Sequence, residues 1–213
     1  MADDAPMTVT IWSDVACPFC NVARERAAWL AENAGAVVQW LPFELHPDYP
    51  PEGVPREDLM RRLPPGADDA ARRMNEEAGL SYNPHPDRIP NTRRALELIE
   101  WARERGAHDG LHERVMEAYW TEGRDISDPD ELAALAAEAG LDPDEARAAL
   151  ESDAYGEAVD ASTALAQRHG IPAVPAFVLD GRLLVSGAQP HEVFTSALEQ
   201  VAAMREKDGA TAG

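Results

Sequence analysis

The stretch from Trp12 to Cys20 reads WSDVACPFC and contains both cysteines of the chain. Ahead of it, the alternating apolar residues over 8–12 predict a β-strand. Within it, Pro18 is typical of the first position of a helix, where its missing N–H does no harm. Residues 36–43, AVVQWLPF, predict a second strand that frays at Pro42. The chain therefore opens as strand, helix and strand, with both cysteines at the first strand-to-helix junction.

Residues 57–150 predict an all-helical block, because apolar residues recur there at helical spacing and β-branched residues are few. The tetrapeptide DPDE occurs at 128–131 and again at 142–145. Each copy offers an aspartate N-cap, a proline at the first helical position and a glutamate in the first turn. We interpret 57–150 as a helical domain inserted into a core that is formed by 1–56 and 151–213.

After the helical block the sequence returns to strand patterns. Residues 176–179 (AFVL) and 182–185 (RLLV) flank the dipeptide DG at 180–181, which favours a hairpin with a type I′ turn. A last amphipathic helix is predicted from about Pro190, and the tail at 207–213 is expected to be disordered. The sequence thus predicts an α/β protein whose strands come from both ends of the chain.

The composition excludes several classes of function. Lys and Arg number 19 against 39 Asp and Glu, which gives a net charge of −20. A surface of this charge repels nucleic-acid phosphates and anionic lipid headgroups, so we expect neither nucleic acid nor membrane as a partner. No run approaches the roughly 18 apolar residues of a membrane span. The opening MADDAPM lacks the features of a secretory signal, so we expect a cytoplasmic protein.

A Cys-x-x-Cys motif at the start of a helix indicates redox chemistry. The unpaired N–H groups and the positive dipole of a helix N-terminus favour the thiolate, which is the reacting form of cysteine. We expect Cys17 to be the nucleophile and Cys20 to be the buried thiol that resolves a mixed disulfide. Pro18 and Phe19 between them carry no charge, which leaves stabilisation of the thiolate mainly to the helix terminus.

Two alternative interpretations of the cysteines stay open. They could be half of a zinc site, for which His46 and His85 are candidate further ligands, although neither lies in a ligand motif. They could also be a structural pair of buried thiols. We expect redox chemistry and no metal, because two cysteines at a strand-to-helix junction become reactive. The remaining histidines are expected at the surface or at helix caps, without partners: His108, His112, His169 and His191.

A second feature is the segment IPAVP at 171–175, directly before the predicted strand 176–179. Proline has no N–H to donate to a sheet ladder, and in a tight loop Pro175 is a candidate for a cis peptide bond. Taken alone, however, this segment favours a different interpretation, in which Pro175 is trans and merely opens an edge strand.

In combination, these motifs resemble the DsbA-like thioredoxin-fold oxidoreductases, and within them the FrnE-like branch. The resemblance covers nearly the whole chain. Besides WSDVACPFC it rests on the following segments: WLPFELHPDYPPEG at 40–53, PNT at 90–92, AYWTEGRDISD at 118–128, GIPAVPAFVLDGR at 170–182 and SGAQP at 186–190.

The resemblance implies a thioredoxin fold, which is a central mixed four-stranded sheet, with the helical domain inserted over the active site. It implies thiol–disulfide oxidoreductase activity. In this family the proline that matches Pro175 is cis and faces the disulfide, where it keeps metals off the thiols. The backbone of Val174 is then expected to pair with an extended substrate segment, as an added β-strand does.

Four further residues match positions of the family. Trp12 and Asp14 match residues ahead of the cysteines, and Asn91 and Gln189 match polar positions of the FrnE-like branch. The resemblance makes Asp14 a candidate for tuning the active site and the other three candidates for substrate binding. A role that only shapes the fold is the alternative for all four.

The sequence departs from the family in two ways. The DsbA oxidants have a histidine between the cysteines, and its absence here predicts a less strongly oxidising disulfide. The acid that the family buries six residues before the first cysteine is replaced by Ile11. A proton relay to Cys20 must then use another group, for which Asp14 and Glu44 are candidates by chain position. A charged surface pair is the alternative for both.

The leading hypothesis is a cytoplasmic dithiol oxidoreductase that reduces or isomerises disulfides of a protein or a small molecule. A cellular thiol reductant recycles it, and no cofactor is needed beyond the cysteine pair, with glutathione as a candidate co-substrate. One alternative is a glutathione-dependent isomerase or transferase that acts on a small molecule. Another is a chaperone-like binding module that uses the groove between core and helical domain.

Overall fold

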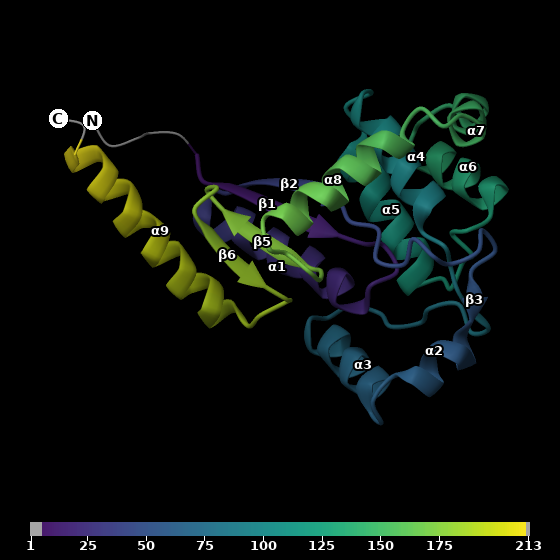
Figure 1. Cartoon of the computed structure of the whole chain (residues 1–213), viewed down its shortest axis with the longest axis horizontal. Helices are drawn as coiled ribbons and strands as arrows, with labels where there is room; N and C mark the ends of the chain where they lie inside the picture. The colour runs from purple at the N-terminus through teal and green to yellow at the C-terminus, as the bar shows by residue number, and fades with distance from the viewer. Residues whose placement is uncertain (1–5, 212–213) are drawn as a thin grey trace.

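The computed structural model describes residues 6–211, and a mixed sheet of four strands lies at its centre (Figure 1). The strands lie in the order β2 (Val37–Pro42), β1 (Thr8–Ser13), β5 (Ala176–Leu179) and β6 (Leu183–Ser186). Strand β1 runs parallel to β2 and antiparallel to β5, and β5 runs antiparallel to β6. The predicted mixed four-stranded sheet is therefore confirmed.

Helices cover the sheet and extend beyond it at both ends (Figure 1). Helix α1 (Pro18–Ala34) connects β1 to β2, and α9 (His191–Thr211) follows β6. Between β2 and β5 lie β3 (Val54–Pro55), α2 (Arg56–Arg62), α3 (Ala67–Glu77), β4 (Arg88–Ile89), α4 (Arg93–Arg103), α5 (His108–Trp120), α6 (Pro129–Glu138), α7 (Pro143–Glu151) and α8 (Gly156–Arg168). Figure 1 shows α4 to α7 gathered at one end and α9 beside β6 at the other. Among the described residues, no helix is both long enough and apolar enough for a membrane span.

Two hydrophobic cores form around the sheet. One joins Val9 and Ile11 of β1 to side chains of α1, β5 and α9. The other joins Trp12 and both cysteines to buried side chains of α4, α5 and α6. The cysteines therefore lie where the sheet meets the helices that follow β2. The division of the chain into a core and an inserted domain 57–150 stays a prediction.

A short antiparallel ribbon that was not predicted joins a strand directly ahead of the helical block to a strand inside it. Strands β3 and β4 pair Val54 with Ile89. Each of these strands has only two residues, which is too short to show the alternation of apolar and polar residues that predicts longer strands. The ribbon fixes the start of α2, because the backbone N–H of Arg56 donates to the carbonyl oxygen of Asp87 at 2.9 Å.

Gly53, directly ahead of this ribbon, has no room for a side chain. Its φ is +77°, and a Cβ there would lie 2.2 Å from the carbonyl oxygen of Ile89. We expect Gly53→Ala to lower the free energy of unfolding by about 2–3 kcal/mol, because left-handed strain adds to a displaced ribbon. Gly79→Ala is the matched control, since its φ is +72° and nothing lies within 4 Å. Urea unfolding measures both variants, and equal losses would contradict the clash.

The C-terminal elements differ from prediction in two details. The turn dipeptide at 180–181 has φ values of 55° and 65°, as a type I′ turn requires, but β6 begins one residue later than predicted. The prediction of disorder is wrong for 207–211, which continue α9, while 212–213 lie outside the described residues. Asp208 forms an ion pair with Arg182, which holds the end of the helix against the hairpin.

The histidine prediction is wrong for three of the four residues. His108 and His112 lie one turn apart on α5 and are both buried, because that face of the helix packs inward. The ring of His191 stacks on Trp29 with centroids 4.8 Å apart. Only His169, the exposed C-cap residue of α8, matches the prediction.

The burial of His112 makes the stability of the protein depend on pH. Burial, helped by the neighbouring His108, lowers the pKa of His112 to about 3. An unfolded histidine titrates near about 6.5, so on acidification the unfolded chain binds the proton first and the free energy of unfolding falls. We expect a loss of about 2 kcal/mol between about pH 7 and pH 5 from this group.

The matched variant is His112→Phe, which keeps a ring to stack on Trp40 but cannot titrate. Guanidinium unfolding at the two pH values compares it with the wild type. We expect the loss of unfolding free energy between the two pH values to be smaller in the variant by about 2 kcal/mol. An identical pH dependence in both proteins would show that His112 does not contribute to it.

Candidate active site

Both cysteines are free thiols at the start of α1. Cys17 is the N-cap residue, with extended backbone, and is 4% exposed, whereas Cys20 lies one turn inside and is fully buried. Burial raises the pKa of the Cys20 thiol well above its usual value, and hydrogen bonding to Cys17 raises it further. Of the two sulfurs, the one of Cys17 is therefore the one that a substrate can reach.

The backbone of Val174 lies directly against Cys17. The Cys17 thiol donates to the carbonyl oxygen of Val174, with sulfur and oxygen 3.6 Å apart. The Val174–Pro175 peptide bond is cis, and the carbonyl oxygen of Pro175 accepts from the N–H of Gly187 at 2.8 Å. The cysteine motif and the segment IPAVP, which the sequence singled out separately, thus lie side by side.

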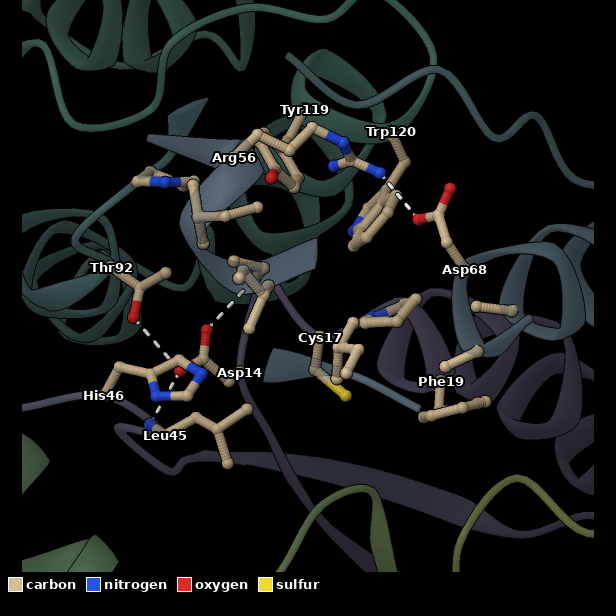
Figure 2. Close-up of a pocket in the computed structure, with 18 of the residues that line it drawn as sticks. Asp14, Cys17, Phe19, Leu45, His46, Arg56, Asp68, Thr92, Tyr119 and Trp120 are labelled. Atoms are coloured by element: carbon tan, nitrogen blue, oxygen red, sulfur yellow. Dashed lines mark hydrogen bonds and ion pairs between the residues drawn. The ribbon is translucent and has the colours of Figure 1, made fainter. Parts of the chain in front are cut away.

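Asp14 is a buried carboxylate that ties three segments together (Figure 2). Its Oδ1 accepts from the N–H of Ala16 at 3.0 Å. Its Oδ2 accepts from the N–H of Leu45 at 2.8 Å and from the hydroxyl of Thr92 at 3.0 Å. Burial raises the pKa of Asp14, and these hydrogen bonds oppose that effect. Asp14 therefore fixes the turn directly ahead of Cys17.

The three other residues named with Asp14 as family matches are Trp12, Asn91 and Gln189. Trp12 is buried at the end of β1, and within the described chain its Nε1 has no hydrogen-bond partner. Asn91 accepts from the N–H of Arg93 at 2.8 Å, at the start of α4. Gln189 donates to the carbonyl oxygen of Ser186 at 2.8 Å. None of the three lines the cavity at the candidate site, and their contact with substrate stays a prediction.

Glu44, the second candidate for a proton relay, belongs to an ion-pair network. Its Oε2 accepts from Arg93 at 2.8 Å, and Arg93 also pairs with Glu97 at 2.7 Å and with Asp160. Burial raises the pKa of Glu44, against the opposing effect of Arg93. The network joins the loop after β2 to α4 and α8, which gives Glu44 a structural role.

A cavity of about 390 Å³ lies beside Cys17 (Figure 2). Its walls come from the start of α1, the loop after β2, helices α2 and α3, and the end of α5. The side chains that form most of these walls are apolar: Phe19, Leu59, Met60, Leu63, Ile89 and Trp120. None of the residues that α2 and α3 contribute to the cavity belongs to a sequence motif. The two residues that α5 contributes, Tyr119 and Trp120, belong to the segment AYW at 118–120, which carries part of the family resemblance.

One side of the cavity is polar. Arg56 pairs with Asp68 at 2.6 Å, and the hydroxyl of Tyr82 donates to the same carboxylate at 2.7 Å. Burial and the bond to Asp68 raise the pKa of Tyr82 to about 12, and burial also raises the pKa of Tyr119. Both phenols are therefore protonated hydrogen-bond donors at neutral pH.

The alternative of a zinc site finds no support among the candidate ligands. The ring of His46 stacks on Tyr49 with centroids 4.3 Å apart, and His85 accepts from the N–H of Asp87 at 3.2 Å. In the part of the chain that the structure describes, no group of three or more His, Cys, Asp or Glu residues is arranged to hold a metal ion.

A dithiol at the start of the first helix, opposite a proline-containing loop and on a mixed four-stranded sheet, defines a thioredoxin-fold protein. The chain belongs to the DSBA-like thioredoxin domain family, which matches residues 8–199. The narrower FrnE-like assignment stays a prediction.

Three relatives show how far the similarity extends. The structure of a probable DsbA oxidoreductase from Streptomyces coelicolor is 34% identical, covers 91% of this chain and 89% of its own, and superposes with a TM-score of 0.83. The uncharacterized protein YwbO of Bacillus subtilis (strain 168) is 30% identical over 192 residues, which are 89% of this chain and 94% of YwbO. The cytosolic disulfide reductase DsbM of Pseudomonas aeruginosa is 21% identical, with a TM-score of 0.68 over 91% of this chain and 99% of DsbM, and shares the fold.

Proposed function

We propose that the chain is a thiol–disulfide oxidoreductase in which Cys17 attacks and Cys20 resolves. The observation that carries the proposal is one thiol that lines a cavity at a helix N-terminus, backed by a second thiol that is fully buried. The Cys17 thiolate attacks a substrate disulfide, forms a mixed disulfide and releases one thiolate. The Cys20 thiolate then attacks the Cys17 sulfur and releases the second thiolate. An external thiol reductant returns the resulting disulfide to the dithiol.

The direction that we propose is reduction or isomerisation of disulfides in the cytoplasm. A reducing thiol pool keeps such a pair in the dithiol form, and the absence of a histidine between the cysteines supports a weak oxidant. A fold relative is described as a cytosolic disulfide reductase, and its structure is also known with GSH. Glutathione is therefore a candidate co-substrate, and calorimetric titration of the wild type and Cys17→Ser tests whether its binding involves this cysteine.

The reduction potential of the Cys17–Cys20 pair tests the proposed direction. We expect a value near that of thioredoxin, about −270 mV, and not near that of DsbA, about −120 mV. The free thiols are alkylated after equilibration in a series of dithiothreitol redox buffers. Mass spectrometry then gives the fractions of dithiol and disulfide protein, from which the reduction potential follows. A potential near that of DsbA would identify a disulfide donor and would contradict the proposed direction. Failure to form the disulfide at all would overturn the dithiol mechanism.

A further inference from the structure

The cavity beside Cys17 has a shape and a chemistry that select a substrate. We propose that it binds one half of a small organic disulfide whose body is apolar, about the size of an aromatic ring, and carries a carboxylate on the side away from the sulfur. This inference rests on the proposed function and names its substrate class.

Access to the sulfur favours a small molecule over a folded protein. Cys17 is 4% exposed and Val174, which also lines the cavity, is 8% exposed. Phe19 and Leu63 are the lining residues with large exposed apolar side chains, at 37% each, and mark the opening to solvent. A disulfide must therefore enter past these two side chains to reach the thiol, which a slender molecule does more readily than a disulfide on a folded surface. A volume of about 390 Å³ lies at the lower end of the range for small-ligand sites.

The walls require an apolar body. Helix α2 buries none of its residues fully, yet Leu59 and Met60 line the cavity and are half-buried. Across from them Ala71 and Trp120 contribute further apolar surface. A ligand that fills this space removes apolar surface from water on both sides, which is the main favourable contribution to binding in such sites.

The polar side offers hydrogen-bond donors, which favour an acceptor on the ligand. Asp68 is already occupied by Arg56 and by the hydroxyl of Tyr82. The Arg56 side chain has Asp68 and Tyr82 as partners, which leaves several of its five N–H groups unused, and over the described residues no hydrogen bond is formed by the hydroxyl of Tyr119. Figure 2 shows Arg56, Tyr119 and Asp68 together on one side of the cavity, with Cys17 and Phe19 on another. The unused N–H groups of Arg56 and the O–H of Tyr119 are donors, and a carboxylate accepts from both.

The reaction follows from this placement. The Cys17 thiolate attacks the sulfur attached to the bound half and displaces the other half as a thiolate. Cys20 then loses its proton and attacks the Cys17 sulfur, which releases the bound half as a second thiolate and leaves a Cys17–Cys20 disulfide, and both protons of the dithiol pass to solvent. The substrate gains two electrons and the cysteine pair loses two. In the assay, dithiothreitol returns the pair to the dithiol.

Two symmetric disulfides serve as probes that differ only in the proposed carboxylate. Dithiobis(benzoate) carries it para to the sulfur, and di-para-tolyl disulfide carries a methyl group there. Stopped-flow measurement follows the release of thiolate when the reduced enzyme reacts with each probe. Each rate is divided by the rate at which free glutathione reacts with the same probe, because the two disulfides differ in intrinsic reactivity. We expect the carboxylate probe to react at least about tenfold faster after this correction.

Two variants test the assigned residues independently. Tyr119→Phe removes a hydroxyl that has no partner, and should lower the rate with the carboxylate probe roughly tenfold while leaving the tolyl probe unchanged. Tyr155→Phe, on a tyrosine outside the cavity, is its control. Ala67→Phe fills the cavity from α3 and should slow both probes at least about tenfold. Ala70→Phe, on the same helix but outside the lining, should change neither.

The outcomes separate this inference from the proposed function. Equal corrected rates for the two probes, or no effect of Tyr119→Phe and Ala67→Phe, would overturn the substrate class while a Cys17–Cys20 disulfide still forms. Reduction of insulin disulfides as fast as the carboxylate probe, and equally sensitive to Ala67→Phe, would replace the small molecule by a polypeptide. If the reduced protein forms no Cys17–Cys20 disulfide with oxidised dithiothreitol, the proposed function itself is overturned.

Discussion

Cys17→Ser is expected to abolish disulfide turnover, with a loss of kcat/KM of at least about a thousandfold. Serine presents a hydroxyl that is not ionised at neutral pH and cannot form a disulfide. No other thiol can take over, because the remaining cysteine, Cys20, is fully buried and burial raises its pKa. Steady-state reduction of dithiobis(benzoate) with dithiothreitol as recycling thiol measures the effect, and circular dichroism shows that the variant is folded.

Cys20→Ser is the complementary variant and has a different expected outcome. Its Cys17 still attacks, so one equivalent of thiolate is released, but the mixed disulfide is not resolved. Mass spectrometry of the protein should then show an adduct of one substrate half on Cys17. Equal steady-state activity in the two variants, or no adduct in Cys20→Ser, would contradict the division of roles between the two cysteines.

Local signals in the sequence predicted those parts of the fold that local chemistry determines. Asp128 and Asp142 cap α6 and α7 through hydrogen bonds of their carboxylates to first-turn N–H groups, as the repeated DPDE predicts. The dipeptide at 180–181 forms the predicted turn because a type I′ turn needs positive φ at both residues. The position of the cysteines at a helix start follows from Pro18 in the same way.

Features that depend on tertiary packing were not predictable in this way. The cavity wall from α2 and α3 depends on contacts between distant segments: the N–H of Arg56 at the start of α2 donates to Asp87, and Asn75 of α3 donates to the carbonyl oxygen of Pro18. The β3–β4 ribbon beside α2 gives no periodic signal, because each of its strands has two residues. The burial of His112 depends on Trp40, which is distant in the chain but stacks on its ring. Arg56 looks like an ordinary surface residue of a helix until Asp68 is placed beside it.

Asp14→Ala is expected to lower the free energy of unfolding by about 3–5 kcal/mol. The carboxylate accepts three hydrogen bonds, from Ala16, Leu45 and Thr92, in a place where Asp14 itself is 1% exposed. Removing it leaves three donors without their acceptor, and each such group costs about 1–3 kcal/mol when it stays buried. Asp48→Ala, on an exposed aspartate near Leu45, is the matched control and should change stability by less than about 0.5 kcal/mol.

The dependence on pH distinguishes the charge of Asp14 from its hydrogen bonds. Because burial raises its pKa in the folded state, the unfolded chain releases this proton first as pH rises above about 4, and the wild type loses stability there. The difference in the free energy of unfolding between the wild type and Asp14→Ala should therefore be larger near pH 4.5 than at pH 7. A double-mutant cycle with Thr92→Val should show a coupling of about 1 kcal/mol or more between the two side chains. Additive losses in that cycle would mean that the Thr92 hydroxyl does not contribute to holding the turn ahead of Cys17.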